Sequence, residues 1–170
     1  MLLLIKYISL LNIILICSFL GFYKSKKYEN RVLELKKILN SLSMFKSKIE
    51  FTYEPICDIF NSISKIIYEE KENIFKLTTE NIKKYDILNS WYIAIEECKN
   101  DLNIEDKEII KMLGKLMGKT DKNGQINEIN LTSKLLENQI EKAEEERLKN
   151  TKLYKTLGIV FGLGISIVLF

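Results

Sequence analysis

The sequence predicts an all-α protein in which a cytoplasmic bundle of about five to six helices lies between two transmembrane helices. The chain of 170 residues begins and ends in apolar segments. The residues between them are highly charged, and their apolar positions recur at the three- and four-residue spacing of amphipathic helices. With one proline and seven glycines, the chain has few points at which a helix must break. We expect a first transmembrane helix at residues 1–23, the cytoplasmic bundle at 24–153 and a second transmembrane, or shallow membrane-inserted, helix at 154–170.

The first apolar segment, residues 7–22, contains no charged side chain, and Lys6 lies close enough to extend its ammonium group to the interface. Counted from Met1, it supplies the roughly 20 residues that a membrane span needs. A cleaved signal peptide is the main alternative. Cleavage requires small residues just before the cut, and the two candidate sites carry Phe19 and Ile16 where one is expected. We therefore expect a retained membrane helix.

The second apolar segment, residues 157–170, covers about 21 Å at about 1.5 Å per residue, less than the roughly 30 Å of a hydrocarbon core. Including residues 153–156 brings it near the minimum. We expect it to span, with a shallow or re-entrant insertion as the alternative. Gly158, Gly162 and Ser166 recur every four residues on one face, a spacing that lets membrane helices approach closely. Their partner is the first span, a second copy of the chain or another membrane protein.

Basic residues beside the two segments predict the orientation. They are Lys24, Lys26 and Lys27 after the first segment, and Lys149, Lys152 and Lys155 before the second. All six lie on the side of the middle region, so the positive-inside rule places that region in the cytoplasm and both chain ends outside. The net charge of +3 is too small, and too evenly mixed with acidic residues, to indicate a nucleic-acid partner.

Composition argues against catalysis. The chain has no histidine, which removes the commonest general base and the commonest zinc ligand. Its three cysteines show no pairing pattern, so a reduced compartment fits. Serine, cysteine and carboxylate side chains stand in no recognisable activating motif. We predict no enzyme activity and no catalytic, cofactor-binding or metal-binding residues.

The spacing of apolar residues divides the middle region into helices. Apolar residues spaced three and four apart form a seam within residues 28–51: Leu35, Ile38, Leu42, Phe45 and Ile49. Pro55 suits the first turn of the next helix, where its missing N–H donor is not needed. A third helix around residues 73–85 is weaker, because Thr78, Thr79 and Asn81 lower helix propensity. Trp91 follows in a helix through about Cys98, and apolar neighbours predict that it is a core anchor.

Asn103 is placed to cap the next helix, because acidic residues follow it in the first turns. Gly114 and Gly118 are four apart; either they admit a neighbouring helix, or Gly118 helps to end this one. The turn containing Asp121 lacks the first and twelfth ligands of a calcium loop, so we interpret it as a helix connection. From Gln125 a helix is expected to continue into the second membrane segment.

Several short motifs together resemble one protein family over about 140 residues. They are Tyr28-x-x-Arg31, Ile49-Glu50-Phe51 before Pro55-Ile56, Trp91 before Leu102 and Asp106, Leu113-Gly114, Gly118 with Asp121, Gln125, and Leu153-Tyr154-Lys155-x-Leu157-Gly158 with Gly162. Their order and spacing, with both apolar ends, resemble the stage III sporulation protein AB family of endospore-forming bacteria.

The resemblance implies a non-enzymatic subunit of a secretion-like channel complex in the mother-cell membrane that faces the forespore. The family's cytoplasmic domain is similar to that of the inner-membrane platform protein of type II secretion, which works beside a cytosolic ATPase. The implied partners are therefore the ATPase and the other membrane subunits of the same assembly, together with membrane lipid.

A second interpretation is a generic membrane-tethered coiled coil that forms homo-oligomers and acts as a structural tether. A simple coiled coil would not need Pro55, Trp91 or the break between Gly114 and Gly124. These features favour a compact bundle.

Overall fold

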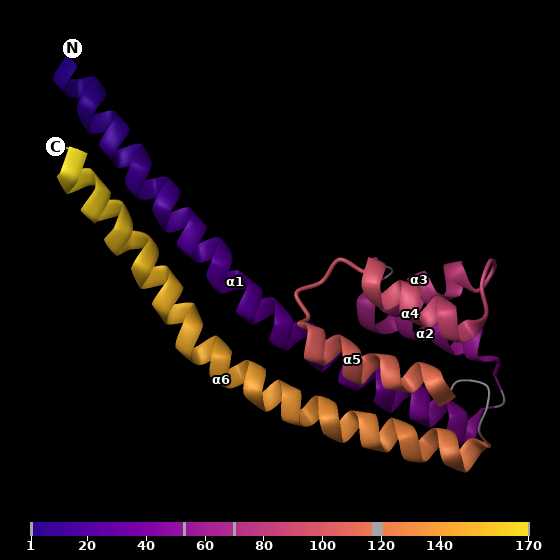
Figure 1. The fold of residues 1–170 in the computed structure, drawn as a ribbon. Helices are drawn as coiled ribbons and strands as arrows, with labels where there is room; N and C mark the ends of the chain where they lie inside the picture. The colour runs from indigo at the N-terminus through magenta and orange to yellow at the C-terminus, as the bar shows by residue number, and fades with distance from the viewer. Residues whose placement is uncertain (1, 53, 70, 117–120, 170) are drawn as a thin grey trace. The chain divides into compact units, whose positions relative to one another are not determined.

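The structure is a computed structural model that describes residues 2–52, 54–69, 71–116 and 121–169. Within these ranges it contains six α-helices, one 3₁₀ helix and no strand (Figure 1), so the predicted all-α class is confirmed. The elements are α1 Leu2–Phe51, α2 Ile56–Tyr68, α3 Ile74–Asn81, α4 Ile87–Glu97, α5 Ile104–Met112, η1 Leu113–Leu116 and α6 Lys122–Leu169.

The two longest helices carry the apolar ends of the sequence. α1 continues from the first apolar segment through the seam residues without a break, because no glycine or proline follows Gly21 before Pro55. α6 begins at Lys122, three residues before the predicted start at Gln125, and continues to Leu169. Each is long and apolar enough to cross a membrane.

The chain divides into two compact units, and α1 and α6 contribute to both. Unit 1 comprises Met1–Val32 and Lys142–Phe170, and unit 2 comprises Leu33–Glu141. These limits follow packing contacts within the chain. The sequence-based limits at residues 23 and 154 concern the membrane borders, and they stay predictions.

Unit 2 is built around a cluster of aromatic side chains from four helices. The Phe60 ring of α2 lies 5.4 Å from those of Phe45 and Phe75 and 5.6 Å from that of Trp91, measured between ring centroids. These separations are typical of favourable aromatic pairs. Trp91 is 1% exposed, and its Nε1 donates a hydrogen bond of 3.0 Å to the carbonyl oxygen of Ile110 in α5. The indole ring therefore satisfies its polar group inside the core.

The short helices of unit 2 start at capping residues. Asn73 and Asp86 accept backbone N–H bonds at the starts of α3 and α4. Asn103 and Asp106 form a reciprocal capping box at the start of α5, as the sequence around Asn103 predicts. Pro55 precedes α2 by one residue instead of lying in its first turn. α3 ends at Asn81, four residues before the loosely predicted limit, because its last residues are poor helix formers.

Candidate functional site

The two candidate spans contact each other in unit 1 through residues with little or no side chain. A Cβ atom added to Gly158 of α6 would lie 2.7 Å from the carbonyl oxygen of Cys17 and 3.1 Å from Cα of Gly21, both in α1. A Cβ added to Gly21 would lie 2.5 Å from the carbonyl oxygen of Tyr154. Such distances leave no room for a side chain, so the backbones approach as closely as glycine permits.

The contact continues along the predicted glycine and serine face of α6. A Cβ added to Gly162 would lie 3.0 Å from Cα of Ile14. Ser166 is buried, and its hydroxyl donates a 2.9 Å hydrogen bond to the carbonyl oxygen of Gly162 and lies 3.5 Å from that of Leu10. In the structure these residues face the first apolar segment, one of the three partners that the sequence left open. Their role in packing helices inside a membrane stays a prediction.

Sequence reasoning missed the opposing face of α1. Ser18, Gly21 and Ser25 are small residues spaced three and four apart, the same signal that drew attention to α6. Ser25 is fully buried and donates a 2.8 Å hydrogen bond to the carbonyl oxygen of Phe22. Comparing the two apolar segments with each other would have found this second stripe.

Charged and aromatic residues continue the contact beyond the apolar segments. The rings of Tyr28 and Tyr154 stack with centroids 5.8 Å apart. Glu29 lies 3.0 Å from the ammonium of Lys26 and 3.6 Å from that of Lys155. The hydrogen bond from Lys26 lowers the pKa of Glu29 below its ordinary value, so this carboxylate stays ionised at neutral pH.

A buried arginine joins the two helices further along. Arg31 Nη1 lies 2.7 Å from Glu146 Oε2, and the Arg31 side chain is only 7% exposed while that of Glu146 is 49% exposed. The geometry is that of a charge-assisted hydrogen bond, and it fixes which turn of α6 faces Arg31.

In unit 2, Gly114 provides a close contact of a different kind. A Cβ added there would lie 2.7 Å from Cδ1 of Trp91, 3.1 Å from Cδ1 of Leu88 and 3.3 Å from Cε1 of Tyr92. Gly114 therefore lets the 3₁₀ turn after α5 pass directly over the Trp91 indole. Gly118, the other glycine of the predicted pair, lies outside the described residues.

The start of α6 is stabilised by Asp121. Its Oδ1 accepts a 3.0 Å hydrogen bond from the backbone N–H of Gly124, and its carbonyl oxygen accepts one of 3.0 Å from the N–H of Gln125. Asp121 is thus placed as a helix-capping residue. Gln125 lies in the first turns of α6, where its backbone completes this cap.

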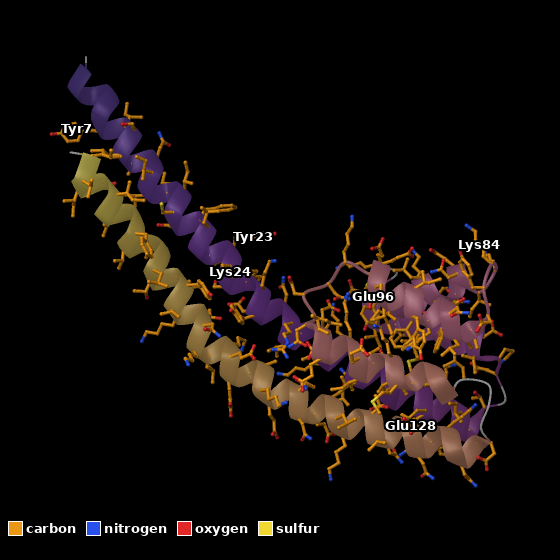
Figure 2. The ribbon with its side chains drawn as sticks, viewed as in Figure 1. Tyr7, Tyr23, Lys24, Lys84, Glu96 and Glu128 are labelled. Atoms are coloured by element: carbon orange, nitrogen blue, oxygen red, sulfur yellow. The ribbon has the colours of Figure 1, made fainter. Side chains whose placement is uncertain are left out.

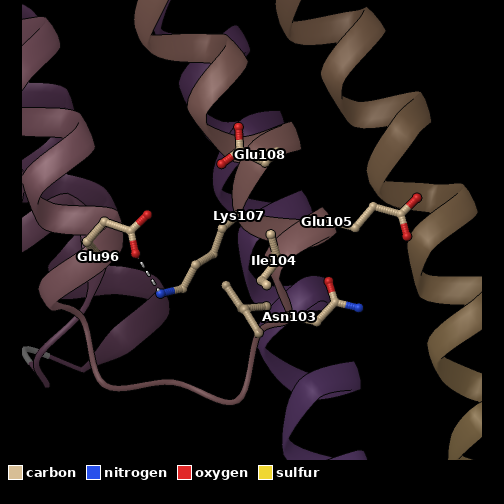
Figure 3. Close-up of a pocket in the computed structure, with 7 residues that line it drawn as sticks. Glu96, Asn103, Ile104, Glu105, Lys107 and Glu108 are labelled. Carbon is tan, nitrogen blue, oxygen red and sulfur yellow. Dashed lines mark hydrogen bonds and ion pairs between the residues drawn. The ribbon is translucent and has the colours of Figure 1, made fainter.

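A shallow groove lies between α4 and α5 (Figure 3). Glu96 of α4 lies 3.2 Å from the ammonium of Lys107 and 2.8 Å from that of Lys111, and Lys111 also lies 2.7 Å from Glu108. Hydrogen bonds from Lys111 and then Lys107 lower the pKa of Glu96. A carboxylate held ionised between two ammonium groups is a poor general acid or base near neutral pH, so the groove offers charge and shape for contact rather than proton transfer.

Comparisons with known proteins agree with the resemblance noted in the sequence. The family model described as "Stage III sporulation protein AB" matches residues 6–170. The Stage III sporulation protein AB of Bacillus subtilis (strain 168) is 22% identical over 169 residues, which cover 97% of this chain and 99% of that protein. A solved structure of a Stage III sporulation protein AB superposes with a TM-score of 0.61 at 16% identity, over 71% of this chain and 98% of that one, and so supports the fold. The chain therefore belongs to the stage III sporulation protein AB family.

Proposed function

We propose that this chain is a non-enzymatic, membrane-anchored platform subunit of the secretion-like sporulation complex between mother cell and forespore. It couples a cytosolic secretion-type ATPase to the membrane subunits of that complex. The observation that carries the proposal is that the same two helices supply both a closely packed apolar pair and part of an all-helical unit with a buried aromatic core. Such a chain combines a membrane anchor with a surface for protein contacts.

The proposal places the two apolar segments of unit 1 in the mother-cell membrane that faces the forespore, and the middle region, residues 24–153, in the cytoplasm. It is supported by family membership, by the two apolar helices and by the six lysines that follow or precede them on the middle-region side. In this orientation, the α4–α5 face of unit 2 is accessible to cytosolic proteins.

The alternative, a homo-oligomeric coiled-coil tether, accounts less well for unit 2. A tether needs only long helices with a continuous apolar seam. The described residues of unit 2 instead form four short helices and the 3₁₀ turn, and the buried side chains of these helices include Phe60, Phe75 and Trp91. Stacked rings from separate helices are typical of a compact domain with a defined surface.

The first test is the heat-resistant spore count of a strain in which the gene is deleted, with and without complementation. We expect the count to fall by several orders of magnitude and to be restored by the unaltered gene. A normal count in the deletion strain would contradict the sporulation role and favour the tether.

The coupling to an ATPase has a separate test. Full-length chain solubilised from sporulating cells should capture the secretion-type ATPase subunit of the complex, and an unrelated two-span membrane protein at equal abundance should not. If the spore count collapses but no ATPase is captured, the subunit role stands and the coupling is wrong.

A further inference from the structure

The charges of unit 1 are segregated along the helix axes. Residues 24–29 and 149–155 contain six lysines and one acidic residue, Glu29. The six lysines, here called the basic collar, are Lys24, Lys26, Lys27, Lys149, Lys152 and Lys155. Acidic residues return only at Glu144, Glu145 and Glu146, farther from the apolar segment. The collar therefore borders the apolar segments directly.

Contacts between the two helices show that both halves of the collar lie at the same level. Tyr28 stacks on Tyr154, and the Lys24 ammonium lies 6.0 Å from the centre of the Tyr154 ring. Lys155 Nζ lies 5.3 Å from the centre of the Phe22 ring and 3.6 Å from Glu29. The lysines of α1 and α6 thus form one band beside the contact of Gly21 with Gly158.

Most of the positive charge in this band is not balanced within unit 1. Glu29 is shared by Lys26 and Lys155 and compensates for one charge. Lys27, Lys149 and Lys152 are exposed, and within the described part of the chain no ion pair or hydrogen bond of their side chains is found. An exposed surplus of this kind needs an anionic partner or counterions.

The length of the band is close to the thickness of one layer of lipid headgroups. Lys149 and Lys155 are six residues apart, about 9 Å along a helix. The headgroup region on each side of a bilayer is about 5–8 Å thick. Phe22 and Tyr23 are 53% and 60% exposed on the apolar side of the collar, and Figure 2 labels Tyr23 next to Lys24. Aromatic rings beside the apolar segment, followed by lysines, are typical of a membrane interface.

We propose that the basic collar binds the headgroups of anionic phospholipids and so selects them as the lipids in contact with unit 1. Lysine clusters directly beside a membrane segment attract anionic lipids through charge, and the attraction weakens with ionic strength. The partner is a lipid because the adjoining apolar segments bring the collar to headgroup depth. The inference rests on the membrane insertion proposed above.

The experiment uses the full-length chain reconstituted in phosphatidylcholine vesicles that contain a trace of spin-labelled phosphatidylglycerol or spin-labelled phosphatidylcholine. The fraction of each label that is immobilised by the protein gives their relative association. At low salt we expect about a fivefold preference for phosphatidylglycerol, falling toward onefold in about 0.5 M NaCl. Equal association of the two lipids at low salt would overturn the proposal.

Three variants identify the collar as the cause. Replacing all six collar lysines by Gln should abolish the preference, whereas replacing them by Arg should keep it, since Arg retains the charge. A matched control replaces six exposed lysines of unit 2 by Gln and should keep the full preference; these are Lys65, Lys71, Lys83, Lys84, Lys99 and Lys134. If the collar Gln variant keeps the preference for phosphatidylglycerol, or if the control loses it, the collar is not the binding surface.

Two further measurements separate the possible failures. Resistance to extraction by alkaline carbonate tests membrane insertion itself, so an extractable chain would contradict the proposed anchor and leave no membrane-level collar. Soluble glycerol phosphate, added at constant ionic strength, should leave the preference for phosphatidylglycerol unchanged. A fall in that preference would identify free phosphate as the ligand and overturn the assignment to lipid.

Discussion

Unit 1 and unit 2 are each stabilised by a different kind of internal packing. In unit 2 the centre is filled by large rings, with Phe60 contacting Phe45, Phe75 and Trp91. In unit 1 the helices contact each other at glycines, which have no side chain: Gly21, Gly158 and Gly162. Water drives the burial of apolar surface, whereas lipid does not distinguish a buried leucine from an exposed one, so membrane helices gain most from close backbone contact. α1 and α6 therefore pack in two ways along their length: through close backbone contact in unit 1 and through buried side chains in unit 2.

The first prediction tests the ring-filled core. Trp91→Ala should lower the free energy of unfolding of unit 2 by about 3–5 kcal/mol, because it removes a fully buried ring and its hydrogen bond to Ile110 and leaves a cavity. Urea unfolding of the full-length chain in detergent, followed by far-ultraviolet circular dichroism, measures the change. Tyr85→Ala is the control, since the Tyr85 ring is 50% exposed, and it should change the free energy by less than about 0.5 kcal/mol. Similar losses in the two variants would show that Trp91 is not the centre of the core.

The second prediction tests the contact built from small residues. Gly162→Leu should destabilise the helix pair by about 1–3 kcal/mol, because any Cβ there meets Ile14 at 3.0 Å, and should leave unit 2 folded. Gly164→Leu is the matched control two residues away, since a Cβ at Gly164 has no atom of the described residues within 4 Å. Spin labels at Tyr7 and Val168 report the separation of the two helices by pulsed electron–electron double resonance.

The distance distribution should broaden for Gly162→Leu and stay narrow for Gly164→Leu. In detergent, less of the proposed sporulation complex should be recovered with the Gly162→Leu chain, because the displaced helix changes the surface that contacts the other subunits. An unchanged distribution and unchanged recovery would mean that the close contact does not organise unit 1.

Much of this fold was accessible from sequence because it depends on local signals. The seam residues Leu35, Ile38, Leu42 and Phe45 are buried as their spacing predicts, and Asn103 caps α5 as its acidic neighbours predict. These features depend on periodicity and on side chains three residues apart, which the sequence displays directly.

The features that the sequence did not predict depend on which segments, far apart in the chain, contact each other. The pairing of Gly21 with Gly158 joins residues at opposite ends of the chain, and periodicity gives a face but not its partner. The ion pair of Arg31 with Glu146 is hidden for the same reason, since many acidic residues were available. The contact of Gly114 with Trp91 needs the path of the 3₁₀ turn, which propensity alone does not fix.

The third prediction concerns the surface of unit 2 and has the smallest effect. The bonds from Lys111 and Lys107 lower the folded-state pKa of Glu96 below its ordinary value of 4.5. A carboxyl group with a lowered folded-state pKa adds stability above its unfolded-state pKa, and this stability is lost as pH falls through the folded-state pKa. Glu96→Gln should therefore lower the urea midpoint at pH 7 by only about 0.1 M, because the ion pairs are exposed.

The difference between the unaltered chain and Glu96→Gln should shrink as pH falls below the ordinary value of 4.5, because Glu96 becomes protonated and then carries no charge for the lysines to bind. Glu97→Gln is the control, because it removes a neighbouring exposed carboxylate whose side chain lies in none of these ion pairs; it should lower the urea midpoint at pH 7 by less than Glu96→Gln does. A midpoint difference that does not shrink as the solution is acidified would mean that Glu96 acts through packing in the α4–α5 groove. Because unit 1 has no part in this groove, Glu96→Gln should leave the separation of the Tyr7 and Val168 labels at pH 7 unchanged.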